Sequence, residues 1–215
     1  MTARMSTYAP TVEYSAQGTK LNRRGIETRR LILETAIQVL AEGAATPPSA
    51  NLVAREAGVT WGTIQHQFGD ADGVWAAVLD HVEGLTDDVL LRVRHHSSLR
   101  RQIAEVVRAL WKIYDTDTAR AVENLRRGLP NDQQDLAVQY PQTAARLRRL
   151  DQAWEVQWSS LFESIDTSAT KLRKLSTMLP GALRGLHDQA RMTSFTADID
   201  TAVDCLIDSV TAYLS

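Results

Sequence analysis

The sequence predicts an all-α protein. Apolar residues recur three or four positions apart along most of the chain after residue 25, which is the spacing of one face of a helix. No stretch alternates apolar and polar residues for long enough to predict a sheet. The 215 residues, 44% of them hydrophobic, are enough to bury a sizeable core.

The first 20 residues are polar and contain Pro10 and Gly18 but no helical period, so we expect a flexible arm over 1–20. They lack the apolar run of a secretion signal, and no later run reaches the roughly 18 apolar residues of a membrane helix. The single cysteine, Cys205, excludes an internal disulfide and favours a cytoplasmic protein without a membrane segment. We expect Cys205 to be a small buried hydrophobe in the last helix.

Three short helices are predicted next, over 26–42, 50–57 and 60–68. The first has one apolar face and ends near Gly43. Ser49 stands where the second helix needs an N-cap, and Gly58 supplies the left-handed residue that turns the chain. Thr60 caps the third helix.

The remaining chain is helical almost to its end. We expect helices over 72–94, 98–115, 118–129, 141–164, 168–192 and 198–214. Pro130 breaks the chain after the third of these. Pro180 is expected to kink or interrupt the helix over 168–192, because its ring removes an internal hydrogen bond.

The third helix carries an unusual outward face. At 100° per residue, Ile64 and Phe68 share the inward side, and Gly62 and His66 point nearly opposite, with Gln65 beside them. A glycine costs a helix about 1 kcal/mol relative to alanine, which is understandable if another surface approaches its backbone closely. Two helices joined by a glycine turn, with a polar face on the second, predict a helix-turn-helix that binds double-stranded DNA.

Several side chains around this face suit DNA. Gln65 and His66 can contact base edges, whereas the Thr60 and Thr63 hydroxyls suit phosphate oxygens. The segment "KLNRRGIETRR" places cations at a helix start, where they oppose the helix dipole unless an anion such as phosphate is present; a solvated helix start is the other reading. The predicted DNA-binding set is Arg24, Arg29, Ser49, Thr60, Trp61, Gly62, Thr63, Gln65 and His66. For Trp61, packing beside the inward face is an equal alternative.

Residues 28–82 resemble the TetR family of bacterial transcriptional regulators. The likeness includes "TRRLILETAIQVLAEGA", Ser49 before "LVAREAGVT", "GTIQHQFG" and "DADGVWAAVLDHV". It implies a dimeric regulator, usually a repressor, with a DNA-binding domain over 21–71 and a larger helical ligand-binding and dimerisation domain over 72–215. The family usually has Tyr where this chain has Gln65 and Lys where it has Ala71. A helical interaction module that has lost sequence-specific DNA binding is therefore the alternative.

The last two predicted helices favour a homodimer. Each carries an apolar stripe: Leu172, Leu175, Leu179, Leu183 and Leu186 on one, and Ile199, Val203, Leu206, Val210 and Leu214 on the other. Gly181 and Gly185 would also let a second helix approach closely. The resemblance implies a four-helix bundle with two helices from each subunit. Alternatively, both stripes close the core of a single chain.

Aromatic residues of the C-terminal half are the candidate effector site. The resemblance places a cavity among these helices, which predicts a small apolar or aromatic effector against Trp111, Tyr114, Trp154 and Trp158. Ordinary core packing is the alternative for most of these rings. We expect no enzyme, cofactor or metal site, because the histidines (His81, His95, His96 and His187) lack ligand spacing and the chain has no phosphate-binding glycine loop or nucleophile elbow.

Overall fold

The computed structural model describes residues 14–43, 49–163, 165–192 and 198–215, and within these ranges the chain forms helices with no strand longer than one isolated bridge. The all-α prediction is confirmed. The helices are α1 (Arg23–Ala41), α2 (Ala50–Glu56), α3 (Trp61–Phe68), α4 (Ala71–Leu90), α5 (Leu99–Tyr114), α6 (Asp117–Gly128), α7 (Gln133–Gln139), α8 (Pro141–Leu161), α9 (Ala169–Ala190) and α10 (Ile199–Leu214). None of the described helices combines the length and apolar character needed to cross a membrane.

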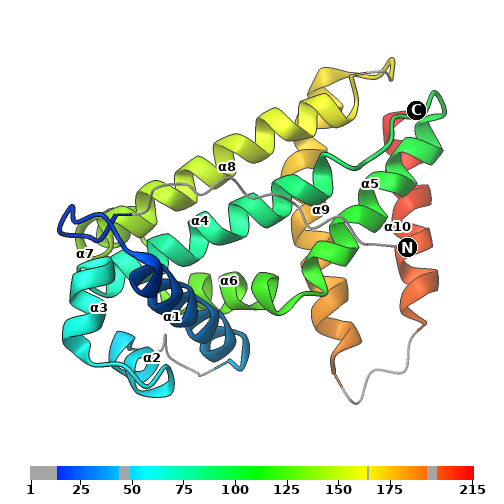
Figure 1. Ribbon diagram of the computed structural model, residues 1–215. Coiled ribbons are helices and arrows are strands. Elements are labelled where there is room, and N and C mark those ends of the chain that lie inside the picture. The colour runs from blue at the N-terminus through cyan, green and yellow to red at the C-terminus, as the bar shows by residue number, and fades with distance from the viewer. Residues whose placement is uncertain (1–13, 44–48, 164, 193–197) are drawn as a thin grey trace, which may run out of the picture.

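Helices α4 and α8 pack side by side and connect the two ends of the molecule (Figure 1). One end holds α1, α2 and α3, and the other holds α5, α9 and α10. Helix α6 packs along α1, which brings the middle of the chain against its first helix. The helix-turn-helix is therefore attached to the rest of the molecule through both α4 and α6.

Local sequence explains the helix starts at the first end. Ser49 Oγ accepts from Leu52 N at 3.3 Å and Thr60 Oγ1 accepts from Thr63 N at 3.2 Å, so both predicted N-caps are confirmed. Gly58 has φ +65°, which is the conformation that the turn requires. Helix α1 begins three residues earlier than expected, because Asn22 Oδ1 caps it through Gly25 N at 2.8 Å.

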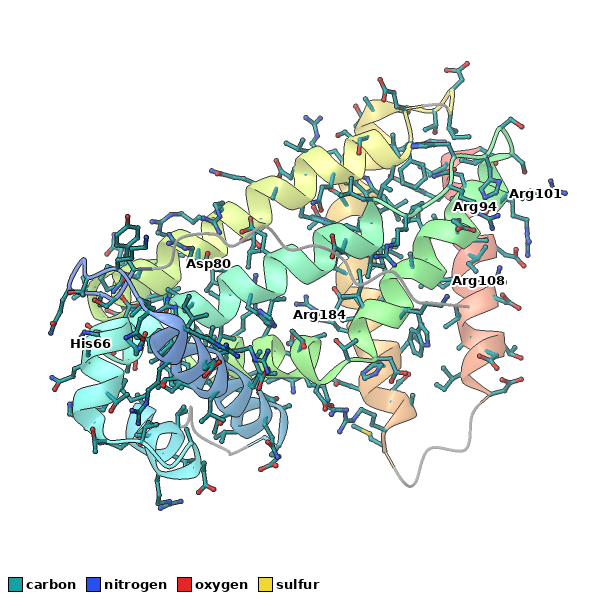
Figure 2. The ribbon with its side chains drawn as sticks, in the orientation of Figure 1. His66, Asp80, Arg94, Arg101, Arg108 and Arg184 are labelled. Carbon is teal, nitrogen blue, oxygen red and sulfur yellow. The ribbon has the colours of Figure 1, made fainter. Side chains whose placement is uncertain are left out.

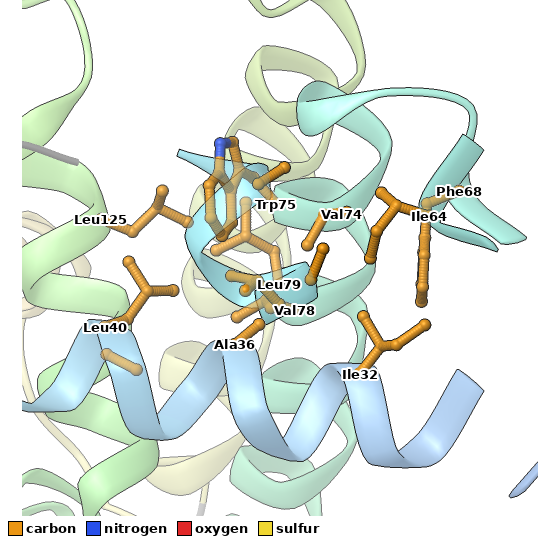
Figure 3. Packing of buried hydrophobic residues seen from close by; sticks show 14 of the residues in the cluster. Ile32, Ala36, Leu40, Ile64, Phe68, Val74, Trp75, Val78, Leu79 and Leu125 are labelled. Atoms are coloured by element: carbon orange, nitrogen blue, oxygen red, sulfur yellow. The ribbon is translucent and has the colours of Figure 1, made fainter. Parts of the chain in front are cut away.

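The core at this end is shared between the helix-turn-helix and the helices that follow it. Ile32, Ala36 and Leu40 of α1 belong to one buried apolar cluster with Ile64 and Phe68 of α3, and Ile32 lies nearest to these two α3 residues (Figure 3). The same cluster includes Trp75, Val78 and Leu79 of α4, Leu125 of α6 and Leu147 of α8. The predicted boundary at residue 71 thus crosses a continuous apolar core, and movement of α4 or α6 must be felt by α1 and α3.

A second core joins α5, α8, α9 and α10. The leucines and valines of the two predicted apolar stripes contribute to it: Leu175, Leu179, Leu183, Val203, Val210 and Leu214 are buried within the chain. The reading in which the stripes close the chain's own core is therefore supported for these six residues. Any partner must cover a different face of α9 and α10.

The structure differs from the expectations for this half in three places. Cys205 is exposed, because α10 buries Val203, Ile207 and Val210 and turns Cys205 away from them. The sequence analysis does not predict α7, because this helix has no apolar face and none of its residues is buried; Asp132 Oδ1 starts it by accepting from Gln134 N and Asp135 N. Helix α9 continues through Pro180, so of the two expected outcomes, a kink or an interruption, the interruption is excluded.

Candidate nucleic-acid interface

Helix α3 presents the two faces that its sequence predicts. Ile64 and Phe68 are 0% and 4% exposed, whereas Gly62 and Gln65 lie on the exposed side and Trp61 is 38% exposed. His66, half-buried, lies near the end of this helix (Figure 2). A Cβ added at Gly62 would meet only Thr60 Oγ1, at 3.7 Å. The exposed side of α3 is therefore a polar surface with bare backbone at its first turn.

The three candidate hydroxyl residues all lie at helix starts. Thr60 and Thr63 contact one another through their Oγ1 atoms at 3.0 Å, and both are at the N-terminus of α3. Ser49 holds the equivalent position in α2. Capping uses an oxygen lone pair, and the Ser49 O–H, which donates to no acceptor among the described residues, can donate to phosphate oxygen.

Arg29, on α1, contacts the last turn of α3 rather than extending into solvent. Its Nη1 donates to Gln67 O at 2.6 Å, and its guanidinium lies 4.2 Å from the centroid of the Phe68 ring. Gln67 is itself buried, and its Nε2 donates to Gly25 O at 3.1 Å. Helix α1 thus fixes the orientation of α3 through polar contacts that the sequence analysis missed, since Gln67 carries no pattern that distinguishes it from an exposed polar residue.

Residues 14–20 also pack on the end of α3. Ala16 N donates to His66 O at 3.2 Å, and Ser15 is 6% exposed, its Oγ accepting from Gln17 N and Thr19 N. The expected flexible arm over 1–20 is therefore wrong for residues 14–20. The arm prediction now concerns residues 1–13 alone, which lie outside the described residues.

Gly73 sets how closely α4 approaches α3. A Cβ added there would lie 1.8 Å from Phe68 O, a backbone atom that cannot move away without shifting the helix. Asp70 Oδ1 accepts from Gly73 N at 2.9 Å and so starts α4 at this point. The close approach makes the first turn of α4 part of the support of α3.

The cations beside α3 differ in how far they are already paired. Arg23 forms an ion pair with Glu27 at 3.0 Å, and Arg30 pairs with Glu34 at 3.1 Å. Arg24 is exposed and has no ion pair among the residues the structure describes. Of the two arginines predicted to contact phosphate from α1, Arg24 therefore remains available to do so, whereas Arg29 stabilises the end of α3.

The aromatic residues predicted to bind an effector pack into the second core. Trp158 is 2% exposed and lies 5.3 Å from Trp154 and 4.8 Å from Phe162, between ring centroids. Trp111 meets the buried ring of His187 edge to face at 5.6 Å. Burial raises the pKa of the Tyr114 hydroxyl, an effect that the nearby Arg184 partly opposes.

The described part of the chain contains three hollows of note, and none of them is lined by Trp111, Tyr114, Trp154 or Trp158. The largest, of about 620 Å³, lies between α1, α4 and α6, and a smaller one of about 200 Å³ adjoins it. The third, of about 410 Å³, lies on the surface of α9 and α10. No group of three metal-ligating side chains occurs within the described residues.

An exposed apolar face lies on α9 and α10, next to their buried stripes. Met178 is 52% exposed and Tyr213 is 42% exposed, and both line the 410 Å³ hollow together with Leu206. A Cβ added at Gly181 or Gly185 would meet no atom within 4 Å. These glycines thus leave the α9 backbone open in the turns that follow Met178.

The fold of this chain is similar to that of transcriptional regulators whose structures are solved. A transcriptional regulator from Rhodococcus sp. Rha1 superposes with a TM-score of 0.66 at 19% identity, covering 86% of this chain and 97% of that one. NalD, the secondary repressor of the MexAB-OprM multidrug efflux pump in Pseudomonas aeruginosa, gives 0.64 at 19%, covering 90% and 98%. A TetR-family protein from Vibrio parahaemolyticus, described as a putative transcriptional regulator, gives 0.61 at 20%, covering 87% and 98%. No protein-family model and no curated protein matches the sequence.

Proposed function

We propose that this chain, which has the fold of TetR-family regulators, is a ligand-responsive DNA-binding transcriptional regulator, most simply a repressor and not an enzyme. The observation that carries the proposal is the exposed polar face of α3, with open backbone at Gly62 and its apolar face held by α1 and α4. A rigidly supported short helix with such a face suits the major groove of double-stranded DNA.

Each side chain of that face then has a role. Gln65 and His66 would contact base edges in the major groove, and Gly62 would let the groove wall approach. The hydroxyls of Ser49, Thr60 and Thr63, together with Arg24, would contact phosphates and fix the register. Trp61, more than a third exposed, would donate its indole N–H to the backbone.

The exposed face of α9 and α10 supports a homodimer through these two helices. Two copies related by a twofold axis would cover Met178 and Tyr213 and bring Gly181 and Gly185 against a partner helix. A twofold dimer presents two copies of α3, so the operator would be an inverted repeat.

An effector that releases the DNA completes the proposal. The aromatic residues of α5 and α8 remain the predicted contact for a small apolar ligand, and such a ligand would have to open a space that the rings fill in this conformation. The shared core of α1, α3, α4 and α6 supports the coupling, because a ligand that favours one packing of α4 or α6 shifts the position of α3.

Selection from random duplexes with the purified protein tests the central proposal. We expect an inverted repeat whose half-site centres lie about one helical turn, or a multiple, apart. His66→Ala and Gln65→Ala should each relax base preference at particular positions and cost about 1–3 kcal/mol. Enrichment of unrepeated sequences would contradict the dimer arrangement, and unchanged selectivity in both variants would exclude α3 as the reading helix.

The alternative, an interaction module of this fold that has lost sequence-specific DNA binding, is favoured by the scarcity of free cations. Arg29 is engaged with Gln67 and Phe68, and Ala71 supplies no charge at the start of α4. Affinity for random duplex distinguishes the two functions. A regulator binds random DNA, and its affinity falls steeply with salt concentration. An interaction module does not bind random DNA.

A further inference from the structure

Residues 14–20 form a closed turn ahead of α1. Ser15 N donates to Thr19 O at 2.8 Å, and the Oγ of the buried Ser15 accepts from Gln17 N and Thr19 N. Gly18 takes φ +75°, and its N–H donates to Ser15 O at 2.9 Å. These hydrogen bonds give the segment a defined backbone, so its exposed side chains project from fixed positions.

The turn is attached to the end of α3. Ala16 N donates to His66 O at 3.2 Å, and Ala16 Cβ lies 3.6 Å from where a Cβ would stand on Gly69, the residue that follows α3. Figure 1 shows the turn, in dark blue, at the outer edge of the end of the molecule that holds α3. The turn therefore extends the surface of α3 beyond the last residue of that helix.

The polar side chains that the turn exposes can all donate hydrogen bonds. They are Tyr14, Gln17, Thr19 and Lys20, and none of them is acidic. Tyr14 and Lys20 face one another across an antiparallel bridge, so both side chains lie on the same side of the turn. Tyr14 is 57% exposed, and Lys20 forms no ion pair with any residue that the structure describes. A partner rich in negatively charged oxygens matches this set of donors.

We propose that this turn is a second DNA-contacting element, in which the Tyr14 hydroxyl and the Lys20 ammonium bind the phosphate backbone beside the groove that receives α3. The inference rests on the proposed function and adds a separate contact to it. Helix α3 has 8 residues and is about 12 Å long, which is about the width of the major groove. Elements at both of its ends can therefore reach the phosphates that border the groove. Thr60 and Thr63 supply donors at the start of α3, and the turn supplies them at its end.

Lys20 also provides positive charge where most cations are already paired. Arg23, Arg30 and Arg55 form ion pairs with neighbouring glutamates. Lys20 and Arg24 have no ion pair in the described part of the chain, and they lie close together at the start of α1. Since affinity for DNA comes largely from phosphates that cations neutralise, the turn adds a second available charge beside Arg24.

Two substitutions in the full-length protein test the contact, with the selected operator and a duplex of unrelated sequence as probes. Lys20→Gln should weaken binding to both duplexes about tenfold at low salt and reduce the slope of log K against log salt by about 0.9, because one phosphate is no longer neutralised. Tyr14→Phe removes only a hydroxyl, so it should weaken binding about threefold and leave the slope unchanged. Lys112→Gln, exposed on α5 at the other end of the molecule, is the matched control and should bind like the wild type.

Directed cleavage distinguishes contact with DNA from mere support of α3. An iron–EDTA group attached to Gln17→Cys, in a Cys205→Ser background that removes the exposed natural thiol, generates hydroxyl radicals beside the turn. We expect cuts in the DNA backbone at the edge of each half-site. The same group on Arg101→Cys, far from the turn, should give none (Figure 2).

The possible failures are distinguishable. If the wild type binds both duplexes while Lys20→Gln and Tyr14→Phe bind them with unchanged affinity and slope, the turn only supports α3 and this inference is overturned. The absence of cuts from the group at residue 17 overturns it as well, even where the substitutions weaken binding. A wild-type protein that binds neither duplex contradicts the proposed function itself, and the role of the turn with it.

Discussion

The indole N–H of Trp154 donates a 3.0 Å hydrogen bond to the carbonyl of Ser176, four residues before Pro180. In a helix this carbonyl normally accepts from the N–H of residue 180, and proline has none. The aromatic residue of α8 therefore supplies the donor that α9 lacks. This explains how α9 passes through Pro180 without ending, which neither helix reveals alone.

A double-mutant cycle measures this compensation. Trp154→Phe should lower the free energy of unfolding by about 1–3 kcal/mol, because it leaves the Ser176 carbonyl without a donor. In a Pro180→Ala background the helix regains its own N–H, so the same change should cost about 1 kcal/mol less. Urea unfolding of the four proteins gives the coupling. Additive effects would mean that Trp154 acts through ring packing alone.

The Asp72 carboxylate, at the start of α4, caps the N-terminus of α8. It is 6% exposed and accepts from Gln142 N and Thr143 N, at 2.8 Å each. Asp72→Ala should lower the free energy of unfolding by about 2–3 kcal/mol, since it removes charge-assisted bonds and orphans two donors. Asp72→Asn keeps one acceptor and should cost less. Asp135→Asn, exposed on α7, is the control; if the Asp72 variants unfold at the same urea concentration as this control, the cap contributes nothing.

Two glycines near α3 should respond in opposite ways to alanine. Gly73→Ala places a Cβ against Phe68 O and should cost about 3 kcal/mol or more, with loss of DNA binding. Gly62→Ala meets open space and should raise the free energy of unfolding by up to about 1 kcal/mol, yet weaken operator binding because the groove wall approaches that backbone. Thermal unfolding and gel shifts on both variants check this. A Gly62→Ala protein with undiminished DNA affinity would show that DNA does not approach there.

The sequence predicted the helices of the helix-turn-helix because each rests on local signals: the caps Ser49 and Thr60, the turn at Gly58, and apolar spacing that buries Ile64. It could not predict the role of Arg29, whose partners are 38 and 39 residues away in sequence. Nor could the sequence show that the leucines of α9 are buried within the chain while Met178 is exposed. The leucines and Met178 all follow helical spacing, and only the packing of α5 and α10 against α9 determines which of them is covered.

Substitutions of Arg24 and Arg29, both on α1, should have different effects on DNA binding and on stability. Arg24→Ala should weaken binding to all duplexes and reduce the slope of log K against log salt by about 0.9, with stability unchanged, since it removes one phosphate contact. Arg29→Ala should instead lower the free energy of unfolding by about 1.5–3 kcal/mol, because it removes a charged hydrogen bond and the contact with Phe68. Arg101→Ala is the distant control for both measurements. An Arg29→Ala protein of normal stability would return Arg29 to the set of phosphate contacts.

If α9 and α10 form the proposed homodimer interface, Gly185→Leu should separate the subunits without unfolding the chain. A Cβ added at this position meets no atom within 4 Å, and leucine is a better helix former than glycine by about 0.8–1 kcal/mol. In the dimer its side chain would fill the space into which the partner helix packs, so sedimentation equilibrium should show a dissociation constant raised at least about 100-fold, beside an unchanged or higher far-UV helix signal. Arg173→Leu adds the same side chain about 120° around α9, at an exposed position, and should leave the dimer intact. A Gly185→Leu protein that dimerises like the wild type would place the interface elsewhere, and operator binding by a monomeric Gly185→Leu protein at full affinity would remove the reason for an inverted repeat.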